Sequence, residues 1–420
     1  MKMAQIVVFL IYCLSLVWLG YSIWRSYRQR HFSFYLLFSV LYAITFFAGF
    51  PLSLIMANMF EYTLPDYASQ QRVFGWAILA YVVYQMGYHI FSSKNTLTPK
   101  ADVASFHAKT TACLLALVGV GSLFIFIYLN EGLLLFKLEK YSQIFSPLIQ
   151  AVPLKRFFYF FLPALLLFFL LKPSVKRWWW FLILSVIFGI LSYLAVGGTR
   201  ANLAMAGLFF LILGLEKQYL SVRWLGLLVA LGIVGMFLLA LARYGLDIHG
   251  KEIYFTFLYL TRDTFSPWEN LARIFSSEME YQGLMPIIRD FYVYIPKSLW
   301  QERPDIVWNS ANYFTKTVLG NQSGLAISPS LLGSFYIMGG YPLIPIGMFL
   351  VGGIIATFDR LFQYGSRYSV VLQTFCLGQV FNLIVLVREG FDAFFSRFFF
   401  FSLVFALCWL IAKGVIRWKR

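Results

Sequence analysis

Residues 110–129 read TTACLLALVGVGSLFIFIYL, a run of 20 residues without a charged side chain. The hydrocarbon core of a bilayer is about 30 Å thick, and a helix needs roughly 20 residues to cross it. Only helices and closed barrels satisfy every backbone hydrogen bond in lipid, and a continuous apolar run lacks the alternation of a barrel strand. The stretch therefore predicts a transmembrane helix.

The rest of the chain has the same character. Of its 420 residues, 60% are hydrophobic and 12% are charged, and the mean hydropathy is +0.74. About 25% of the residues of a soluble protein are charged. We expect an all-α integral membrane protein with about eleven crossings. The predicted helices are residues 4–24, 32–56, 73–92, 110–129, 157–171, 178–196, 201–215, 224–241, 326–358, 369–387 and 394–412.

Lys and Arg residues beside the predicted helices indicate the orientation, because they are retained on the cytoplasmic side. The connections between the predicted helices alternate between the two sides of the membrane. Those on one side, beginning with residues 25–30 and ending with the C-terminus, form one set. This set carries 17 of the 34 basic residues and three of the 18 acidic ones, Asp102, Glu216 and Asp359. The pattern predicts an outer N-terminus and a cytoplasmic C-terminus. It accounts for most of the net charge of +16, so nucleic acid is not expected as a partner.

Three regions follow from this topology. Residues 1–241 hold the first eight helices, residues 242–325 form one large outer loop, and residues 326–420 hold the last three helices and a short cytoplasmic end. We expect the aromatic-rich loop to pack on the helices or to lie at the interface. Irregular backbone at membrane depth is tolerated where it lines a cavity or is buried in protein. A site is therefore indicated near residues 326–358, which are interrupted by Pro329, Gly339, Gly340, Pro342 and Pro345.

A short outer turn, Gly197-Gly198-Thr199-Arg200-Ala201-Asn202, joins two predicted helices. Its glycines allow close approach of the backbone, the next helix begins with unpaired amides, and Arg200 adds a positive charge. This combination suits a phosphate or pyrophosphate. A tight hairpin whose arginine reaches the lipid headgroups is the alternative.

Further arginines follow in the outer loop. Arg243 stands at its start, and two Arg-Asp neighbours come later, Arg262-Asp263 and Arg289-Asp290. Each neighbour pair is either a structural ion pair or part of a site. In a site, the carboxylate would accept a proton from a sugar hydroxyl and the arginine would stabilise an anionic leaving group. Glu269 and Arg273 are four residues apart and predict a surface pair on one helix.

The last two predicted helices are joined by a charged segment that contains Arg388, Glu389 and Asp392. Arg397 would lie about one turn inside the membrane, where it needs a partner such as Glu389 or Asp392. These groups either hold helices together or bind substrate. We predict that six arginines gather at the outer face: Arg200, Arg243, Arg262, Arg289, Arg388 and Arg397.

The sequence offers little support for metal or nucleotide chemistry. None of the four histidines has a second histidine or a carboxylate at zinc spacing, so a metal is not expected. No phosphate-binding Walker loop and no serine-nucleophile motif is present. His249 is a weak candidate for a base.

Six stretches resemble the Wzy-type oligosaccharide polymerases that build enterobacterial common antigen, and the likeness runs from the first helix to the last. The stretches are 141–146 (YSQIFS), 154–164 (LKRFFYFFLPA), 196–202 (VGGTRAN), 257–272 (FLYLTRDTFSPWENLA), 309–315 (NSANYFT) and 323–329 (SGLAISP).

The resemblance implies a GT-C-like glycosyltransferase of the bacterial inner membrane that works at the periplasmic face without a metal or other cofactor. Its donor would be a growing chain on undecaprenyl pyrophosphate, and its acceptor a lipid-linked trisaccharide of N-acetylglucosamine, N-acetylmannosaminuronic acid and 4-acetamido-4,6-dideoxygalactose. A polysaccharide co-polymerase that sets chain length and a lipid-linked oligosaccharide flippase are the implied partners.

On this reading, Arg200, Arg243 and Arg289 hold the donor pyrophosphate, and Asp263 or Asp290 receives the acceptor proton. Arg262, Arg388, Glu389, Asp392 and Arg397 complete the expected substrate site. Two other functions remain open: a flippase or exporter that performs no chemistry, and a ligase that moves the glycan to the lipid A core.

Overall fold

The computed structural model describes residues 2–92, 105–138, 149–244, 250–295, 299–302, 308–322 and 326–418. All regular secondary structure in these residues is helical. Eight helical stretches are long and apolar enough to cross a membrane. The all-α integral membrane protein that the sequence predicts is therefore confirmed. The eight stretches are Met3–Gln29, Phe34–Phe60, His107–Phe136, Val152–Leu171, Val175–Val196, Ser330–Tyr368, Val370–Arg388 and Phe391–Val415.

Each of the eleven predicted ranges coincides with helix in the structure. Three of them lie outside the eight stretches. Ala201–Glu216 and Trp224–Gly235 are apolar but shorter, and Tyr67–Phe91 is long but contains several Tyr and Gln residues. The number of crossings therefore stays a prediction, as does the GT-C-like architecture.

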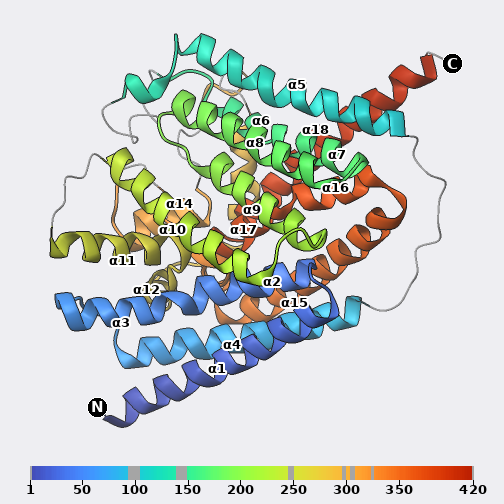
Figure 1. Ribbon diagram of the computed structural model, residues 1–420. Coiled ribbons are helices and arrows are strands. Elements are labelled where there is room, and N and C mark those ends of the chain that lie inside the picture. The colour runs from blue at the N-terminus through green and yellow to red at the C-terminus, as the bar shows by residue number, and fades with distance from the viewer. Residues whose placement is uncertain are drawn as a thin grey trace. The chain divides into compact units, whose positions relative to one another are not determined.

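The described chain divides into two compact units, each built from separate stretches of sequence. Unit 1 consists of Met1–Asn95, Ile248–Arg360 and Asn382–Phe398. Figure 1 labels its helices: α1 (Lys2–Gln29), α2 (Phe34–Ala43), α3 (Gly49–Phe60), α4 (Tyr67–Phe91), α11 (Lys251–Phe265), α12 (Trp268–Ser276), α13 (Met285–Asp290), α14 (Ser310–Tyr313) and, in part, α15 (Ser330–Tyr368), α17 (Val380–Arg388) and α18 (Phe391–Trp418).

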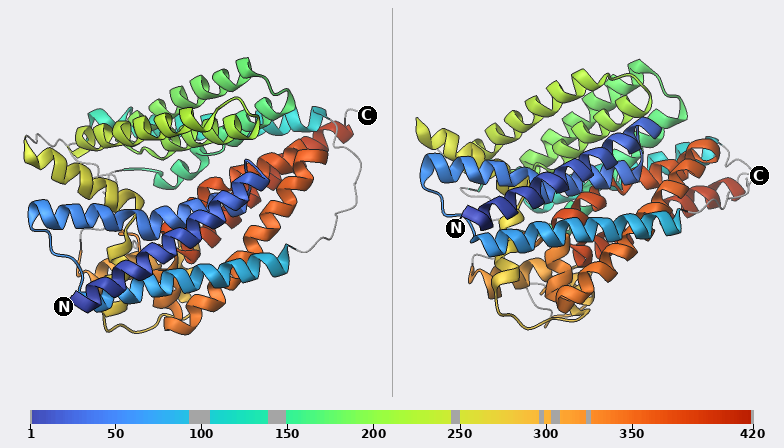
Figure 2. Two further views of the ribbon diagram at one scale, coloured as in Figure 1. Left: turned by 60° about the horizontal axis from the view of Figure 1, so that its bottom comes forward. Right: turned by 90° about the horizontal axis from the view of Figure 1, so that it is seen from below.

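Aromatic rings from distant stretches form the core of unit 1. Helix α4 lies beside α1, as the two views of Figure 2 also show, and α12 packs on α4. Trp268 at the start of α12 is fully buried, and its ring centroid lies 5.4 Å from that of Phe50 and 5.5 Å from that of Phe74. Helix α11 packs on α3. These parts of the predicted outer loop therefore pack on the helices, as expected.

Helix α15 is broken where the sequence predicts it. Gly339 (φ −156°, ψ 23°) and Gly340 (φ 68°, ψ −161°) leave the helical conformation, and only glycine adopts the second combination easily. The amide of Gln282 donates to the carbonyl oxygen of Ile337 at 2.9 Å, next to the break. The helix then continues to Tyr368, ten residues beyond the predicted end.

Because α15 is longer than predicted, the assignment of Asp359 to a connecting loop is wrong. Asp359 lies in the helix and is 3% exposed. Its carboxylate accepts from the amides of Phe34 (2.6 Å) and Tyr35 (3.1 Å) and from the hydroxyl of Tyr88 (2.9 Å). It thus satisfies amides at the start of α2, which have no partner within their own helix.

Unit 2 consists of Thr96–Asp247, Leu361–Phe381 and Phe399–Arg420. Helices α8 and α9 form a hairpin, and α5 packs on α7. In its core, the rings of Phe160 and Phe401 stack with centroids 5.2 Å apart. Its helices are α5 (Ser105–Leu129), α6 (Lys155–Phe158), α7 (Phe161–Leu171), α8 (Val175–Val196), α9 (Ala201–Glu216), α10 (Val222–Tyr244), α16 (Val370–Gly378) and the remaining parts of α15, α17 and α18.

Candidate functional site

A sharp turn between α17 and α18 carries a partly exposed charged cluster of unit 1. The turn contains Arg388, Glu389 and Gly390 and joins two stretches that are each long and apolar enough to cross a membrane. Gly390 has φ +122°, and a Cβ there would lie 2.5 Å from the Cβ of Ser334. The Ser334 hydroxyl also accepts from the amide of Phe391 at 3.1 Å. The first half of α15 therefore fixes the shape of the turn.

Of the two partners that the sequence suggests for Arg397, Glu389 and Asp392, the structure pairs it with Glu389. Arg397 Nη2 lies 2.7 Å from Glu389 Oε2, and the two side chains are 28% and 35% exposed. This ion pair is held in one geometry but remains open to solvent. Arg388 is half-buried, and its Nε is buried without a hydrogen-bond partner among the described residues. The turn thus presents two arginines and one carboxylate that a ligand can reach.

Two buried carboxylates lie behind the turn. Asp290 accepts from Asn309 Nδ2 at 2.7 Å and from the hydroxyl of Ser396. Asp392 accepts from the amide of Ser310 at 2.7 Å. Asp290 is close enough to act electrostatically on both Asp392 and Arg397, and is itself only 5% exposed. Asp290 therefore lies within electrostatic range of both groups, while its own hydrogen-bond donors are Asn309 and Ser396.

The two neighbouring Arg-Asp pairs are not ion pairs within the described part of the chain. Arg289 donates to Gln282 Oε1 at 3.4 Å, while the adjacent Asp290 is buried against other partners. Asp263 is exposed, whereas Arg262 beside it is buried. Consecutive residues on a helix do not face each other, which explains both separations.

The predicted pair between Glu269 and Arg273 is wrong. Glu269 Oε1 lies 2.9 Å from Arg262 Nη1, and both side chains are 7% exposed. Glu269 also accepts from the hydroxyls of Ser53 (2.7 Å) and Tyr62 (2.6 Å), while Arg273 is exposed. Glu269 turns inward because Trp268 and Leu271, on the same helix, bury it against α3 and α4.

Arg262 is consequently occupied by internal partners. Its Nη1 also donates to the Tyr62 hydroxyl at 2.8 Å, and its guanidinium lies over the rings of Tyr62 and Tyr259. Burial alone would lower the pKa of Arg262, but Glu269 and Tyr62 together raise it above its ordinary value. Arg262 therefore stays charged and fastens α11 to α12 and to Tyr62, which follows the end of α3.

Arg200 and Arg243 belong to unit 2. The turn before α9 is the expected tight hairpin, because Gly197 (φ +75°) and Gly198 (φ +113°) adopt left-handed conformations and the Gly198 amide donates to the Tyr193 carbonyl oxygen at 2.9 Å. Arg200 directly precedes α9 and is half-buried. Arg243 is the penultimate residue of α10, and its side chain, like His249, lies outside the described residues. Anion binding at the hairpin and the gathering of six arginines at one face stay predictions.

The sequence matches one protein family over residues 1–419, described as WzyE protein, O-antigen assembly polymerase. The chain belongs to the WzyE family. This membership confirms the resemblance found in the sequence and makes the protein a polysaccharide polymerase of the membrane. No solved structure matches the WzyE-family chain described here.

Some contributors to the WzyE-family site were not identified from the sequence. Asn309, Ser310 and Ser396 supply the donors to the two buried aspartates. Asn309 caps α14, since its Oδ1 accepts from the Asn312 amide at 2.9 Å. An Asn-Ser pair before a short apolar run is a helix-start signal, and it would have located α14. No local signal connects Ser396 to Asp290, which lies 106 positions earlier.

Proposed function

We propose that this WzyE-family protein polymerises lipid-linked oligosaccharide repeats at the periplasmic face of the inner membrane. It transfers the growing chain from undecaprenyl pyrophosphate to an incoming lipid-linked trisaccharide of enterobacterial common antigen. The family match over residues 1–419 carries the reaction class. The partly exposed Arg397–Glu389 pair beside Arg388 supports placing the reaction site at this turn of unit 1.

The contacts within unit 1 support this orientation. At one end of the unit the Phe34 amide donates to Asp359, and Arg360 donates to the carbonyl oxygen of Phe91. Connections rich in basic residues lie next to these contacts. The Arg262–Glu269 pair, Asp290 and the turn at Gly390 belong to segments that the same topology assigns to the opposite side. The second group contains balanced charges, as expected for the translocated face.

The reaction has three parts: one bond forms, one bond breaks and one proton is transferred. A hydroxyl oxygen of the acceptor sugar forms a bond to the anomeric carbon of the donor chain. The bond from that carbon to the pyrophosphate oxygen breaks, and the pyrophosphate leaves as an anion on the lipid. The hydroxyl proton passes to a base. Arginines at the leaving oxygen stabilise the developing charge, and a carboxylate receives the proton.

Arg397 and Glu389 serve two of these steps after their ion pair separates: Arg397 stabilises the leaving pyrophosphate, and Glu389 accepts the proton. A pyrophosphate carries more charge than one carboxylate and forms bidentate hydrogen bonds with guanidinium groups. It therefore displaces Glu389 from Arg397, and the freed Glu389 receives the acceptor proton. Asp290 lies within electrostatic range of Arg397. Asp263 and Asp290 are the alternative candidates for the base. Substitution of each residue distinguishes them from Glu389.

Chain length in cells tests the proposal. Glu389→Gln and Arg397→Gln are each expected to reduce the product to one repeat unit at normal protein level, because each removes a group that acts on the reacting bonds. Glu278→Gln is the matched control, since Glu278 is an exposed acid, and it should leave chain length unchanged. Long chains from Glu389→Gln together with single units from Asp263→Asn or Asp290→Asn would refute Glu389 as the base.

The position of the product separates the two other candidate functions. A flippase predicts that single repeats accumulate on the cytoplasmic side when the protein is absent. A ligase predicts that the glycan moves to the lipid A core. The polymerase predicts that periplasmic single repeats accumulate in its absence, and that long chains remain on undecaprenyl pyrophosphate in its presence.

A further inference from the structure

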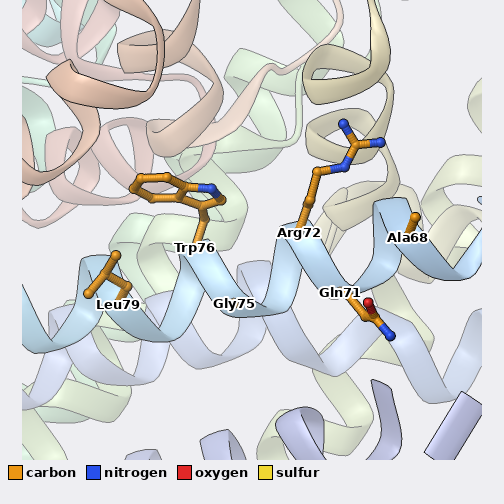
Figure 3. A pocket seen from close by; sticks show the side chains of 6 residues that line it. All are labelled: Ala68, Gln71, Arg72, Gly75, Trp76 and Leu79. Carbon is orange, nitrogen blue, oxygen red and sulfur yellow. The ribbon is translucent and has the colours of Figure 1, made fainter. Parts of the chain in front are cut away.

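A groove of about 470 Å³ runs along one face of α4 in unit 1. Figure 3 shows the six residues that line it, with the side chains of Arg72 and Trp76 on the same side of the helix, one turn apart. The lining is Ala68, Gln71, Arg72, Gly75, Trp76 and Leu79. From the first to the last of these positions the helix rises about 16 Å. The groove is therefore long, open and mainly apolar, and Arg72 lies one turn from its Ala68 end.

Arg72 at this end is available to an anion. Its side chain is exposed, and its two hydrogen bonds, to the Phe275 carbonyl oxygen (3.4 Å) and the Ser69 hydroxyl (3.3 Å), are long. No carboxylate forms an ion pair with Arg72 in the described part of the chain. Asp66 lies near enough for Arg72 to contribute to the lowering of its pKa, after the hydrogen bond from Ser69. A phosphate group binds a guanidinium more strongly than these neutral partners do.

The groove becomes apolar one turn further along. The ring of Trp76 stacks on that of Tyr341 with centroids 4.9 Å apart and an interplanar angle of 18°. Tyr341 is in turn packed against Phe275, so this wall is held in place. Gly75 has no side chain, and a Cβ added there would meet nothing within 4 Å. The space above Gly75 is thus open to a thin hydrocarbon chain.

A contact with α1 indicates how deep in the membrane the groove lies. Gln71 Nε2 donates to the Ala4 carbonyl oxygen of α1 at 3.3 Å, and α1 becomes apolar enough to cross a membrane from Met3 onward. Arg72 therefore lies at the end of a membrane span, where lipid phosphates reside. Trp76 and Leu79 lie deeper, at the level of the acyl chains.

We propose that this groove binds the phosphate and the first isoprene units of a polyprenyl-phosphate lipid. The phosphate contacts Arg72, and the hydrocarbon lies along Gly75, Trp76 and Leu79. The inference rests on the proposed function, in which undecaprenyl pyrophosphate, a lipid of this class, carries the substrates and is released as product. The groove also belongs to the same unit as the Arg397–Glu389 turn, to which it is connected through the first half of α15.

Binding of undecaprenyl phosphate to the purified full-length protein in detergent tests the inference. Arg72→Gln and Gly75→Leu are each expected to weaken binding about tenfold, which corresponds to roughly 1.4 kcal/mol. The first variant removes the charge, and the second places an apolar side chain in the open space above Gly75. Arg273→Gln removes an exposed arginine from the neighbouring helix α12 and should bind like the unaltered protein. Unchanged binding by both groove variants would overturn the inference.

Two competitors distinguish the source of the phosphate. Phosphatidylglycerol and inorganic phosphate should each compete poorly, because the first has thicker paired chains and the second has no chain. Equal competition by either would show that the groove does not recognise a polyprenyl lipid, and would overturn the inference. Arg273→Gln should retain both lipid binding and polymerisation, and polymerisation is measured separately from binding by the length of the product. If the groove variants bind normally, the groove inference fails but the proposed polymerisation does not. If the protein does not polymerise, the proposed function fails but the binding result still stands.

Discussion

The buried pair of Arg262 and Glu269 gives the most quantitative prediction. Replacing Glu269 with Ala removes a carboxylate that accepts from Arg262, Ser53 and Tyr62. Arg262 then stays buried without its counter-charge. Since both side chains are only 7% exposed, water screens the pair little, and loss of one partner of a buried pair costs about 3–5 kcal/mol. We expect Glu269→Ala to lower the free energy of unfolding by that amount.

Unfolding of the purified protein by titration with a denaturing detergent measures the loss. Glu252→Ala is the matched control, because Glu252 is an exposed acid on the same helix as Arg262, and it should change the free energy by less than about 0.5 kcal/mol. A double variant, Arg262→Met with Glu269→Leu, should recover most of the loss, since apolar residues of similar volume replace buried ion pairs well. A loss below about 1 kcal/mol for Glu269→Ala would refute the structural role of the pair.

Three further substitutions test the packing of unit 1. Gly352→Leu should cost about 3 kcal/mol or more of unfolding free energy, because a Cβ at Gly352 would overlap backbone of α4; stability within 1 kcal/mol of the unaltered protein would contradict this contact. Asp359→Asn should cost about 1–3 kcal/mol, since the amide offers one acceptor oxygen where the carboxylate serves three donors; faster hydrogen exchange at the start of α2 should accompany it. Gly340→Val should cost about 1–3 kcal/mol through backbone strain, whereas Gly20→Ala, in open space on α1, should be neutral or slightly stabilising.

The apolar runs were sufficient to predict the helices, because a lipid environment permits little other than helix for such sequences. Residues 110–129 and ten further ranges all coincide with helix. The break in α15 was also predictable, since Gly339 and Gly340 stand before Pro342. The helix end was not, because the charged residues Asp359 and Arg360 look like a loop but find buried or backbone partners.

The pairing of charged residues could be predicted only in part. The burial cost of an arginine inside a helix demands a nearby acid, which narrowed the partner of Arg397 to Glu389 or Asp392, and the structure shows Glu389. The partner of Arg262 was missed, because chain proximity favoured Asp263 for Arg262 and Arg273 for Glu269. The actual pair depends on which face of α12 is buried, and this is decided by Trp268 packing between α3 and α4. Such a choice is made by tertiary contacts, which spacing along the chain does not reveal.

The most direct test of the polymerase assignment uses the purified protein alone with defined undecaprenyl-pyrophosphate-linked trisaccharides. Our account predicts a ladder of chains that remain on the lipid carrier, and its loss in Arg397→Gln while Glu278→Gln retains it. A product that never exceeds one repeat, from protein that is folded and binds the lipid substrate, would contradict the account.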